Sequence, residues 1–141
     1  MEDYLKLDKQ LCFPIYALSR EVIQRYRPLL DEIDLTYPQY LVLMVLWEHQ
    51  QQTVNQIGGK LLLDSGTLTP LLKRLEQKQL VIRQRSKTDE RVVEISLTDE
   101  GKQLRTKAEQ IPLKLIQELG ISLEEITVMK NIINKLLKIK K

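Results

Sequence analysis

The sequence predicts a mainly helical protein with one small β-hairpin, and three observations support this. Only five glycines and five prolines interrupt its 141 residues. Apolar residues recur at spacings of three and four over most of the chain, which is the period of a helix with one buried face. The spacing changes to two only once, after Gln79, over a stretch that suits a hairpin. A composition of 43% hydrophobic and 29% charged residues is typical of a globular protein.

The first expected helix covers residues 8–30, where eight apolar side chains share one face: Leu11, Ile15, Leu18, Val22, Ile23, Tyr26, Leu29 and Leu30. Pro14 lies past the first turn of such a helix and would remove one of its hydrogen bonds. The helix therefore either begins near Leu11 or bends beside Cys12.

The second expected helix begins within residues 35–38 (Leu-Thr-Tyr-Pro) and runs to about His49. Thr36 or Tyr37 lies outside the helix, and Pro38 suits its first turn. Residues 41–47 are apolar nearly all round the helix, so we expect this helix to be buried on most sides.

A helix-turn-helix candidate follows. Thr53 and Gln56 have the spacing of a capping box, which predicts a short helix to about Leu62. Asp64 caps a second helix, from Ser65 to about Lys78. Residues 80–85 and 91–97 then resemble two strands, joined by the polar segment 86–90. A helix-turn-helix followed directly by a basic hairpin predicts a winged helix.

The remaining residues predict two further helices. Residues 98–100 (Thr-Asp-Glu) open a helix towards Leu119, disturbed at Pro112, and Gly120 ends it. Residues 122–125 form another capping box and open a last helix to about Lys138. The apolar stripes of the first and last helices exceed what a small winged helix covers. We therefore expect a single domain over 1–141 that forms a homodimer through helices at about 8–30 and 99–138, with a separate lobe at about 36–97.

Several classes of protein are excluded by composition. Cys12 is the only cysteine and His49 the only histidine, so a disulfide framework and a multi-cysteine or His-rich metal site are impossible, and we expect no metal or cofactor. The longest apolar run, 41–47, is far shorter than the roughly twenty residues of a membrane helix. The first residues lack a secretory pattern, so we expect a cytoplasmic protein without a membrane partner.

Charge is unevenly distributed along the chain. Residues 28–72 hold five acids and one base, a net charge of −4, whereas residues 73–91 hold seven bases and three acids, a net charge of +4. Such a block is a candidate footprint for a polyanion, although a charged stretch is more often an ordinary solvated face.

The predicted winged helix places this block where DNA would lie. The second helix of a helix-turn-helix enters the major groove with its N-terminal residues foremost. The small or hydroxyl-bearing candidates there are Ser65, Gly66, Thr67 and Thr69. The basic candidates for phosphate contacts are Lys73 and Arg74 on the helix and Arg83, Arg85, Lys87 and Arg91 on the hairpin.

Asp89 precedes Arg91 by two residues at the tip of the expected hairpin. The carboxylate can hold the guanidinium extended for a narrow minor groove. The alternative is a surface ion pair worth under about 1 kcal/mol, and the spacing alone does not separate the two.

Three segments resemble the MarR family of transcription regulators. Residues 63–76 (Leu-Asp-Ser-Gly-Thr-Leu-Thr-Pro-Leu-Leu-Lys-Arg-Leu-Glu) are similar to the family's recognition helix, 85–91 to its wing and 97–101 to the helix start after the wing. The resemblance covers nearly the whole chain. It implies a dimeric winged-helix repressor or activator on a pseudo-palindromic double-stranded operator, in which Asp89 orients Arg91 and Arg91 enters the minor groove.

Cys12 lies in an apolar setting near a helix start. A lone cysteine there is usually a small core hydrophobe, but a helix N-terminus favours the thiolate. The phenols of Tyr16, Tyr26 and Tyr37 are candidate donors to such a thiolate, although each tyrosine alone is more often a packing residue.

Residues 11–13 (Leu-Cys-Phe), 26–30 and 35–43 resemble the organic-hydroperoxide-sensing, OhrR-like branch of the MarR family. This resemblance implies that Cys12 reacts with organic hydroperoxide, that Tyr26 and Tyr37 hydrogen-bond it from the same subunit, and that Tyr16 approaches from the partner. With no second cysteine, the sulfenic acid would react with a small external thiol or overoxidise.

Three alternatives remain open from the sequence. The chain also resembles global redox regulators of the same branch. A MarR regulator can instead bind a small phenolic or carboxylic effector and leave Cys12 inert. A thiol peroxidase is less favoured, because turnover needs repeated reduction and the sequence offers no resolving cysteine or general-base histidine near Cys12.

Overall fold

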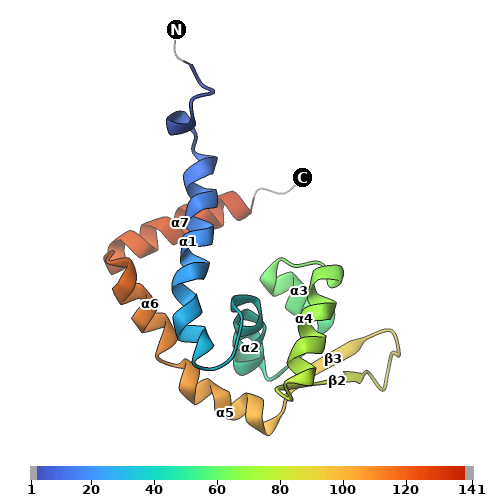
Figure 1. Cartoon of the computed structure of the whole chain (residues 1–141). Helices are drawn as coiled ribbons and strands as arrows, with labels where there is room; N and C mark the ends of the chain where they lie inside the picture. The colour runs from blue at the N-terminus through green and yellow to red at the C-terminus, as the bar shows by residue number, and fades with distance from the viewer. Residues whose placement is uncertain (1–2, 139–141) are drawn as a thin grey trace. The chain divides into compact units, whose positions relative to one another are not determined.

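The structure is a computed structural model that describes residues 3–138 (Figure 1). The chain divides into two compact units, Met1–Glu109 and Gln110–Lys141. The first unit holds helices α1 to α5 and a three-stranded sheet, and the second holds helices α6 and α7. Within the described residues, every helix is too short or too polar to span a bilayer.

The first unit begins with a 3-10 turn, η1 (Leu7–Lys9), and helix α1 (Cys12–Asp31). The helix does not reach back to residue 8, because the extended backbone of Gln10 separates the turn from it, and the alternative of a start near Leu11 is confirmed. Pro14 therefore lies within the first turn of α1, where the amide hydrogen that it lacks has no partner in the helix. In Figure 1 the first half of α1 extends away from the lobe formed by α2, α3, α4 and the sheet.

Helix α2 (Tyr37–His49) is the core helix of this unit. Thr36 caps it: the Thr36 hydroxyl accepts from the Gln39 amide at 3.3 Å, and Gln39 Oε1 accepts from the Thr36 amide at 3.0 Å. The helix is buried on most sides as expected, with Val42, Leu43 and Leu46 fully buried.

The helix-turn-helix consists of α3 (Val54–Leu61) and α4 (Ser65–Gln77), each capped by the residue that the sequence predicts. Thr53 and Gln56 form a reciprocal capping box, and the Asp64 carboxylate caps α4. The inward face of α4 is a row of buried leucines: Leu68, Leu72 and Leu75.

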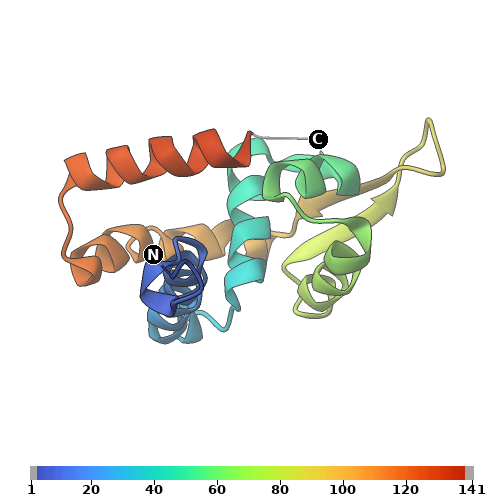
Figure 2. The same ribbon diagram turned by 90° about the horizontal axis from the view of Figure 1, so that it is seen from above.

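The sheet has one strand more than expected. Strands β2 (Val81–Arg85) and β3 (Val93–Leu97) form the antiparallel hairpin. A short strand β1 (Gln51–Thr53) pairs with the other edge of β3, which gives the order β1-β3-β2. Three polar residues carry no alternation of polarity, so β1 could not be predicted from the sequence. Both views show the hairpin loop extending beyond α3 and α4 (Figures 1 and 2).

Helix α5 (Asp99–Ala108) starts close against the end of the helix-turn-helix. Thr98 caps it, and a Cβ atom on Gly101 would lie 2.2 Å from the carbonyl oxygen of Leu80. The indole of Trp47 donates to the carbonyl of Gly101 at 2.8 Å, which connects α5 to α2.

The second unit holds α6 (Ile111–Leu119) and α7 (Leu123–Leu137). A single helix from residue 99 to Leu119, disturbed at Pro112, was expected. The helix instead stops at Ala108, and Pro112 lies in the first turn of α6, where proline is favoured. Gly120 ends α6 in a left-handed conformation (φ 67°). Six large apolar side chains of α7 are 40–59% exposed: Val128, Met129, Ile132, Ile133, Leu136 and Leu137.

Candidate nucleic-acid interface and cysteine site

The N-terminal turn of α4 presents the predicted small and hydroxyl-bearing residues. Asp64 Oδ1 accepts from the Thr67 amide at 2.7 Å, and this hydrogen bond holds the pKa of the Asp64 carboxyl below its usual range. Ser65, Gly66 and Thr67 are exposed and Thr69 is half-buried. The turn therefore offers hydroxyl groups and a positive helix end to a polyanion. Lys73 and Arg74, both exposed, follow one to two turns on.

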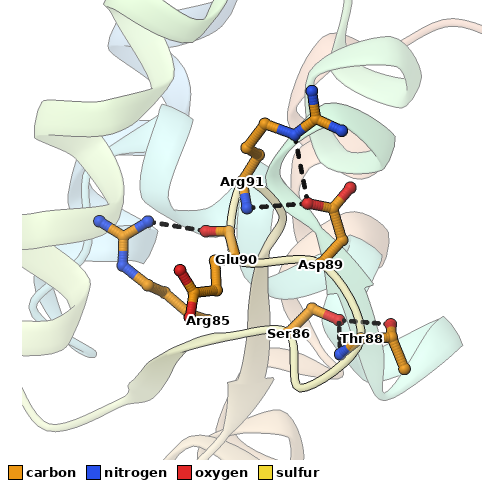
Figure 3. A network of polar contacts seen from close by, with 6 residues as sticks. All are labelled: Arg85, Ser86, Thr88, Asp89, Glu90 and Arg91. Carbon is orange, nitrogen blue, oxygen red and sulfur yellow. Dashed lines mark hydrogen bonds and ion pairs between the residues drawn. The ribbon is translucent and has the colours of Figure 1, made fainter.

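Arg91 lies at the tip of the hairpin, and its side chain is held by the neighbouring Asp89 (Figure 3). Asp89 Oδ1 accepts from both the Arg91 amide at 3.0 Å and the Arg91 Nε at 3.3 Å. The Arg91 side chain nevertheless remains 91% exposed. The carboxylate thus binds one edge of the guanidinium, and the two terminal nitrogens point away from it (Figure 3).

The loop behind Arg91 is stiffened by its own polar residues (Figure 3). Arg85 donates to the carbonyl of Glu90 at 2.8 Å, and the hydroxyls of Ser86 and Thr88 lie 3.0 Å apart. Arg85 therefore supports the loop in addition to adding positive charge. Lys87 is exposed in the same loop.

Arg83 differs from the other predicted bases. Its side chain is 27% exposed and lies 3.9 Å from the Glu76 carboxylate on α4. Its Nε is buried without a hydrogen-bond partner among the described residues. A cavity of about 180 Å³ lies beside it, lined also by Thr53, Asn55 and Thr69. Arg83 thus faces the helix-turn-helix, a placement that strand alternation alone did not predict.

The four residues predicted to form the cysteine site lie in two separate groups within one chain. Cys12 is the first residue of α1 and is exposed. Tyr16 lies one turn along the same helix, 61% exposed, with the guanidinium carbon of Arg20 4.4 Å from its ring centre.

Tyr26 and Tyr37 form the other group. Their ring centres lie 4.7 Å apart, and Tyr40 is 5.8 Å from the first and 6.3 Å from the second. Tyr40 was not among the predicted site residues, although it follows Tyr37 by three positions on α2 and so shares its face.

The expected contact of Cys12 with Tyr26 in one subunit is wrong. Both residues belong to the uninterrupted helix α1, and fourteen residues at 1.5 Å each separate them by about 21 Å. Tyr37 packs against Tyr26, with ring centres 4.7 Å apart, so it too lies far from Cys12 in the same chain. Tyr16, expected from the partner, is instead the tyrosine next to Cys12 in its own chain.

The three clustered phenols keep their protons at neutral pH. Burial, together with the neighbouring Tyr37 and Tyr40, raises the pKa of Tyr26 to about 12. Burial also raises the pKa of Tyr37 and, with the proximity of Tyr37, that of Tyr40. The hydroxyls are therefore hydrogen-bond donors under physiological conditions.

A cavity of about 250 Å³ opens beside Tyr37, between the second half of α1 and the start of α2. Its lining includes the apolar Ile23, Leu30 and Leu35 and two residues of opposite charge, Arg27 and Asp31. The cavity has room for a small apolar group next to the phenol of Tyr37.

Comparisons with known proteins identify relatives over most of the chain. The family model described as "Transcriptional regulator SarA/Rot" matches residues 24–108. The organic hydroperoxide resistance transcriptional regulator of Bacillus subtilis is 53% identical over 127 residues, which cover 88% of this chain and 86% of that protein.

Two solved structures of AbfR from Staphylococcus epidermidis are also similar. Reduced AbfR bound to DNA matches with a TM-score of 0.79 and 40% identity, covering 96% of each chain. Overoxidised AbfR bound to DNA matches with a TM-score of 0.76 and 42% identity, covering 92% of each chain.

Proposed function

The chain belongs to the SarA/Rot family of MarR-type transcriptional regulators, and we propose that it represses transcription until an organic hydroperoxide oxidises Cys12. One geometric observation carries the DNA-binding part of this proposal: Arg91 stands 91% exposed at the tip of the wing, held there by Asp89. An arginine presented in this way suits the negative potential of a narrow minor groove.

Recognition of the operator then divides between two elements. The N-terminal turn of α4, with Ser65, Gly66, Thr67 and Thr69, enters the major groove, and Arg91 enters the adjacent minor groove. Lys73, Arg74, Arg85 and Lys87 supply phosphate contacts. Arg83 contributes indirectly, because its ion pair with Glu76 joins the wing to the recognition helix.

The active form is a homodimer. The exposed apolar stripe of α7 and the exposed Leu11, Ile15 and Leu18 of α1 require covering, and a second copy of the chain covers both across a two-fold axis. Two recognition helices about 34–36 Å apart then match the half-sites of a pseudo-palindromic operator. A sedimentation experiment at micromolar concentration that gives only a 16.6 kDa species would refute the dimer.

The dimer also explains how Cys12 meets the half-buried phenols. Because α1 keeps Cys12 about 21 Å from Tyr26 in its own chain, Tyr26 and Tyr37 of the partner subunit are the donors to the Cys12 sulfur. The cavity beside Tyr37 receives the apolar residues that flank the cysteine. Tyr16 lines the same site from the cysteine's own helix.

Oxidation proceeds in two balanced steps. The Cys12 thiolate attacks the terminal peroxide oxygen, an S–O bond forms, the O–O bond breaks, and the organic group leaves as its alcohol after taking up a proton. A small thiol then attacks the sulfenic sulfur, an S–S bond forms, and water leaves. Because overoxidised AbfR was solved on DNA, we assign release from the operator to the bulkier mixed disulfide.

Other functions are less well supported. We propose that the protein reacts stoichiometrically as a regulator, since the relatives that it matches are transcriptional regulators. A regulator of this kind acts beside the chromosome, in the cytoplasm, without a cofactor. Release by a phenolic or carboxylic effector is the second candidate, because the cavity beside Tyr37, with Arg27 and Asp31 in its lining, has room for a small aromatic group.

The deciding experiment measures binding to an operator duplex selected from a random pool by the reduced protein. We expect cumene hydroperoxide, in the presence of a small thiol, to release the wild-type protein. The Cys12→Ser variant should bind equally well and stay bound. Release of Cys12→Ser by salicylate, without any effect of hydroperoxide on the wild type, would establish the effector instead.

A further inference from the structure

We propose that Lys78 is a positioning residue that couples the turn carrying Tyr37 to the recognition helix, so that a change at the sensing site reaches the DNA-binding surface through its ammonium group. This inference rests on the proposed function and names the residue through which the two sites communicate. From the sequence, Lys78 is only the expected end of a helix and one of the bases of residues 73–91.

Lys78 moves with the recognition helix because its backbone ends that helix. Its amide donates to the carbonyls of Arg74 and Glu76, and Gln79 follows in a left-handed conformation (φ 63°). Leu80 then donates back to the carbonyl of Leu75 at 3.1 Å. The last turn of α4 is therefore closed by its own hydrogen bonds, and a force on Lys78 acts on the whole helix.

The side chain of Lys78 reaches across to the turn between α1 and α2. Nζ donates to the backbone carbonyl of Asp34 and to Gln39 Oε1 at 3.2 Å, and it lies 3.6 Å from the Asp34 carboxylate. The Asp34 side chain is 95% exposed, so its ion pair contributes little. The carbonyl and the Gln39 amide are the acceptors that fix the position of the lysine.

Gln39 makes this contact specific to the sensing site. The residue is 3% exposed, and its Oε1 accepts from the Thr36 amide as well as from Lys78. The same capping box defines the start of α2, whose first residue is Tyr37. The oxygen that holds Lys78 therefore belongs to the turn that positions the Tyr37 phenol.

Lys78 provides every hydrogen bond and ion pair found between residues 31–39 and residues 65–78, which are α4 with its C-cap, within the part of the chain that the structure describes. The far side of the same helix end is held by α5, since Thr98 donates through its hydroxyl to the carbonyl of Gln79 at 2.6 Å. A displacement of the Tyr37 turn thus pulls the end of α4 through Lys78 while α5 acts as the opposing support.

We expect the protein to fold without this lysine. The buried leucines of α4 hold the helix against the core, and the Lys78 side chain is 30% exposed. Replacement by methionine keeps the aliphatic stem and removes the three donors. Lys102→Met, on exposed α5, is the matched control because it makes the same change of charge away from this contact.

The first test separates oxidation from release. Wild type, Lys78→Met and Lys102→Met are treated with cumene hydroperoxide and a small thiol, and both the loss of free Cys12 thiol and the operator affinity are measured. We expect all three to oxidise at the same rate. The ratio of operator affinities before and after oxidation should fall at least about fivefold for Lys78→Met and stay unchanged for Lys102→Met. An unchanged ratio in Lys78→Met overturns the proposal.

The second test does not use the oxidant, so it distinguishes a failure of this inference from a failure of the proposed function. Tyr37→Ala is made with and without Lys78→Met, and hydrogen exchange of the backbone amides of residues 74–80 is measured. We expect Tyr37→Ala to accelerate exchange about fivefold when Lys78 is present and less than about twofold in the Lys78→Met background. Equal acceleration in both backgrounds overturns the coupling, even if hydroperoxide releases the wild type.

Discussion

Cys12 and Tyr26 lie on one unbroken helix, fourteen residues apart, and the helix keeps them about 21 Å from each other in a single chain. A site that needs both residues must therefore be completed by a second subunit. The contact between the two subunits then also forms the sensing site. Each dimer holds two such sites, and each site contains residues of both subunits.

Mixed dimers test this arrangement directly. One chain carries Cys12→Ser and the other carries Tyr26→Phe with Tyr37→Phe, so the dimer retains a single cysteine. If the partner supplies the phenols, that cysteine faces two intact tyrosines and should react with hydroperoxide at the wild-type rate. The homodimer of the double phenylalanine variant should react about tenfold more slowly. A mixed dimer as slow as that homodimer would instead place the phenols in the cysteine's own chain.

Substitutions in the wing test the role of Asp89, because an effect of charge and an orienting effect would change operator affinity in opposite directions. Arg91→Ala should weaken operator binding by about 1–3 kcal/mol per half-site, and by more than Lys102→Ala. Asp89→Ala removes a negative charge near DNA and would strengthen binding if charge alone mattered. Because Asp89 holds the Arg91 backbone and Nε, we expect Asp89→Ala to weaken binding. Fluorescence anisotropy at matched salt decides between these outcomes, and tighter binding by Asp89→Ala would contradict the orienting role.

The tyrosine cluster should be visible in an alkaline titration. Burial raises the pKa of Tyr26 to about 12, from an ordinary value near 10. The protonated phenol therefore contributes its full stabilisation below pH 10, and this contribution is lost as the pH rises from 10 through about 12. We expect the ultraviolet absorbance of ionised tyrosine to develop in two steps, and Tyr26→Phe to remove part of the later step. A single step near pH 10 for all tyrosines would contradict the buried cluster.

Two glycines in helices should respond oppositely to alanine. At Gly101 a Cβ would lie 2.2 Å from the Leu80 carbonyl oxygen, so Gly101→Ala must separate α5 from the end of the helix-turn-helix. We expect a loss of about 1–3 kcal/mol in the free energy of unfolding. At Gly59, on α3, nothing lies within 4 Å of the new Cβ, and Gly59→Ala should gain up to about 1 kcal/mol. Urea unfolding of both variants checks the contrast, and equal losses would argue against the close approach of α5.

The parts of the fold that sequence predicts well are those specified locally. Thr36 and Gln39 specify the start of α2 through hydrogen bonds three residues apart, and the structure contains both bonds. Asp89 and Arg91 are paired by a spacing of two within one loop. Strand β1 was missed because its partner, β3, lies more than forty residues away and its own three residues are polar.

For the candidate site, the residues could be predicted from the sequence, but not how they are divided between the two subunits. Resemblance to a family identified Cys12, Tyr16, Tyr26 and Tyr37, but it placed Tyr26 and Tyr37 in the cysteine's own subunit and Tyr16 in the partner, which the length of α1 contradicts. Helix length bears on this division because it measures the distance from Cys12 to Tyr26 directly. Lys78 escaped notice for a related reason: its acceptors, Asp34 and Gln39, lie about forty positions earlier in the chain.

The last prediction concerns the small thiol that release requires. Cys12 is the only cysteine, so its sulfenic acid cannot form a disulfide within the dimer except with the other Cys12. Those two cysteines belong to different composite sites.

Hydroperoxide alone should therefore give sulfenic acid and then overoxidised protein. Both species should retain operator binding, because added oxygen is small and overoxidised AbfR was solved on DNA. Adding glutathione or cysteine together with the hydroperoxide should form a mixed disulfide that displaces the phenols from the Cys12 sulfur and releases the operator. Intact-mass measurement identifies the species, and operator binding is measured on the same samples. A subsequent dithiol should restore binding only in the mixed-disulfide sample, since sulfinic and sulfonic acids are not reduced by thiols. Full release by hydroperoxide in the complete absence of thiol would mean that oxygen on Cys12 is sufficient, and the mixed-disulfide step would have to be abandoned.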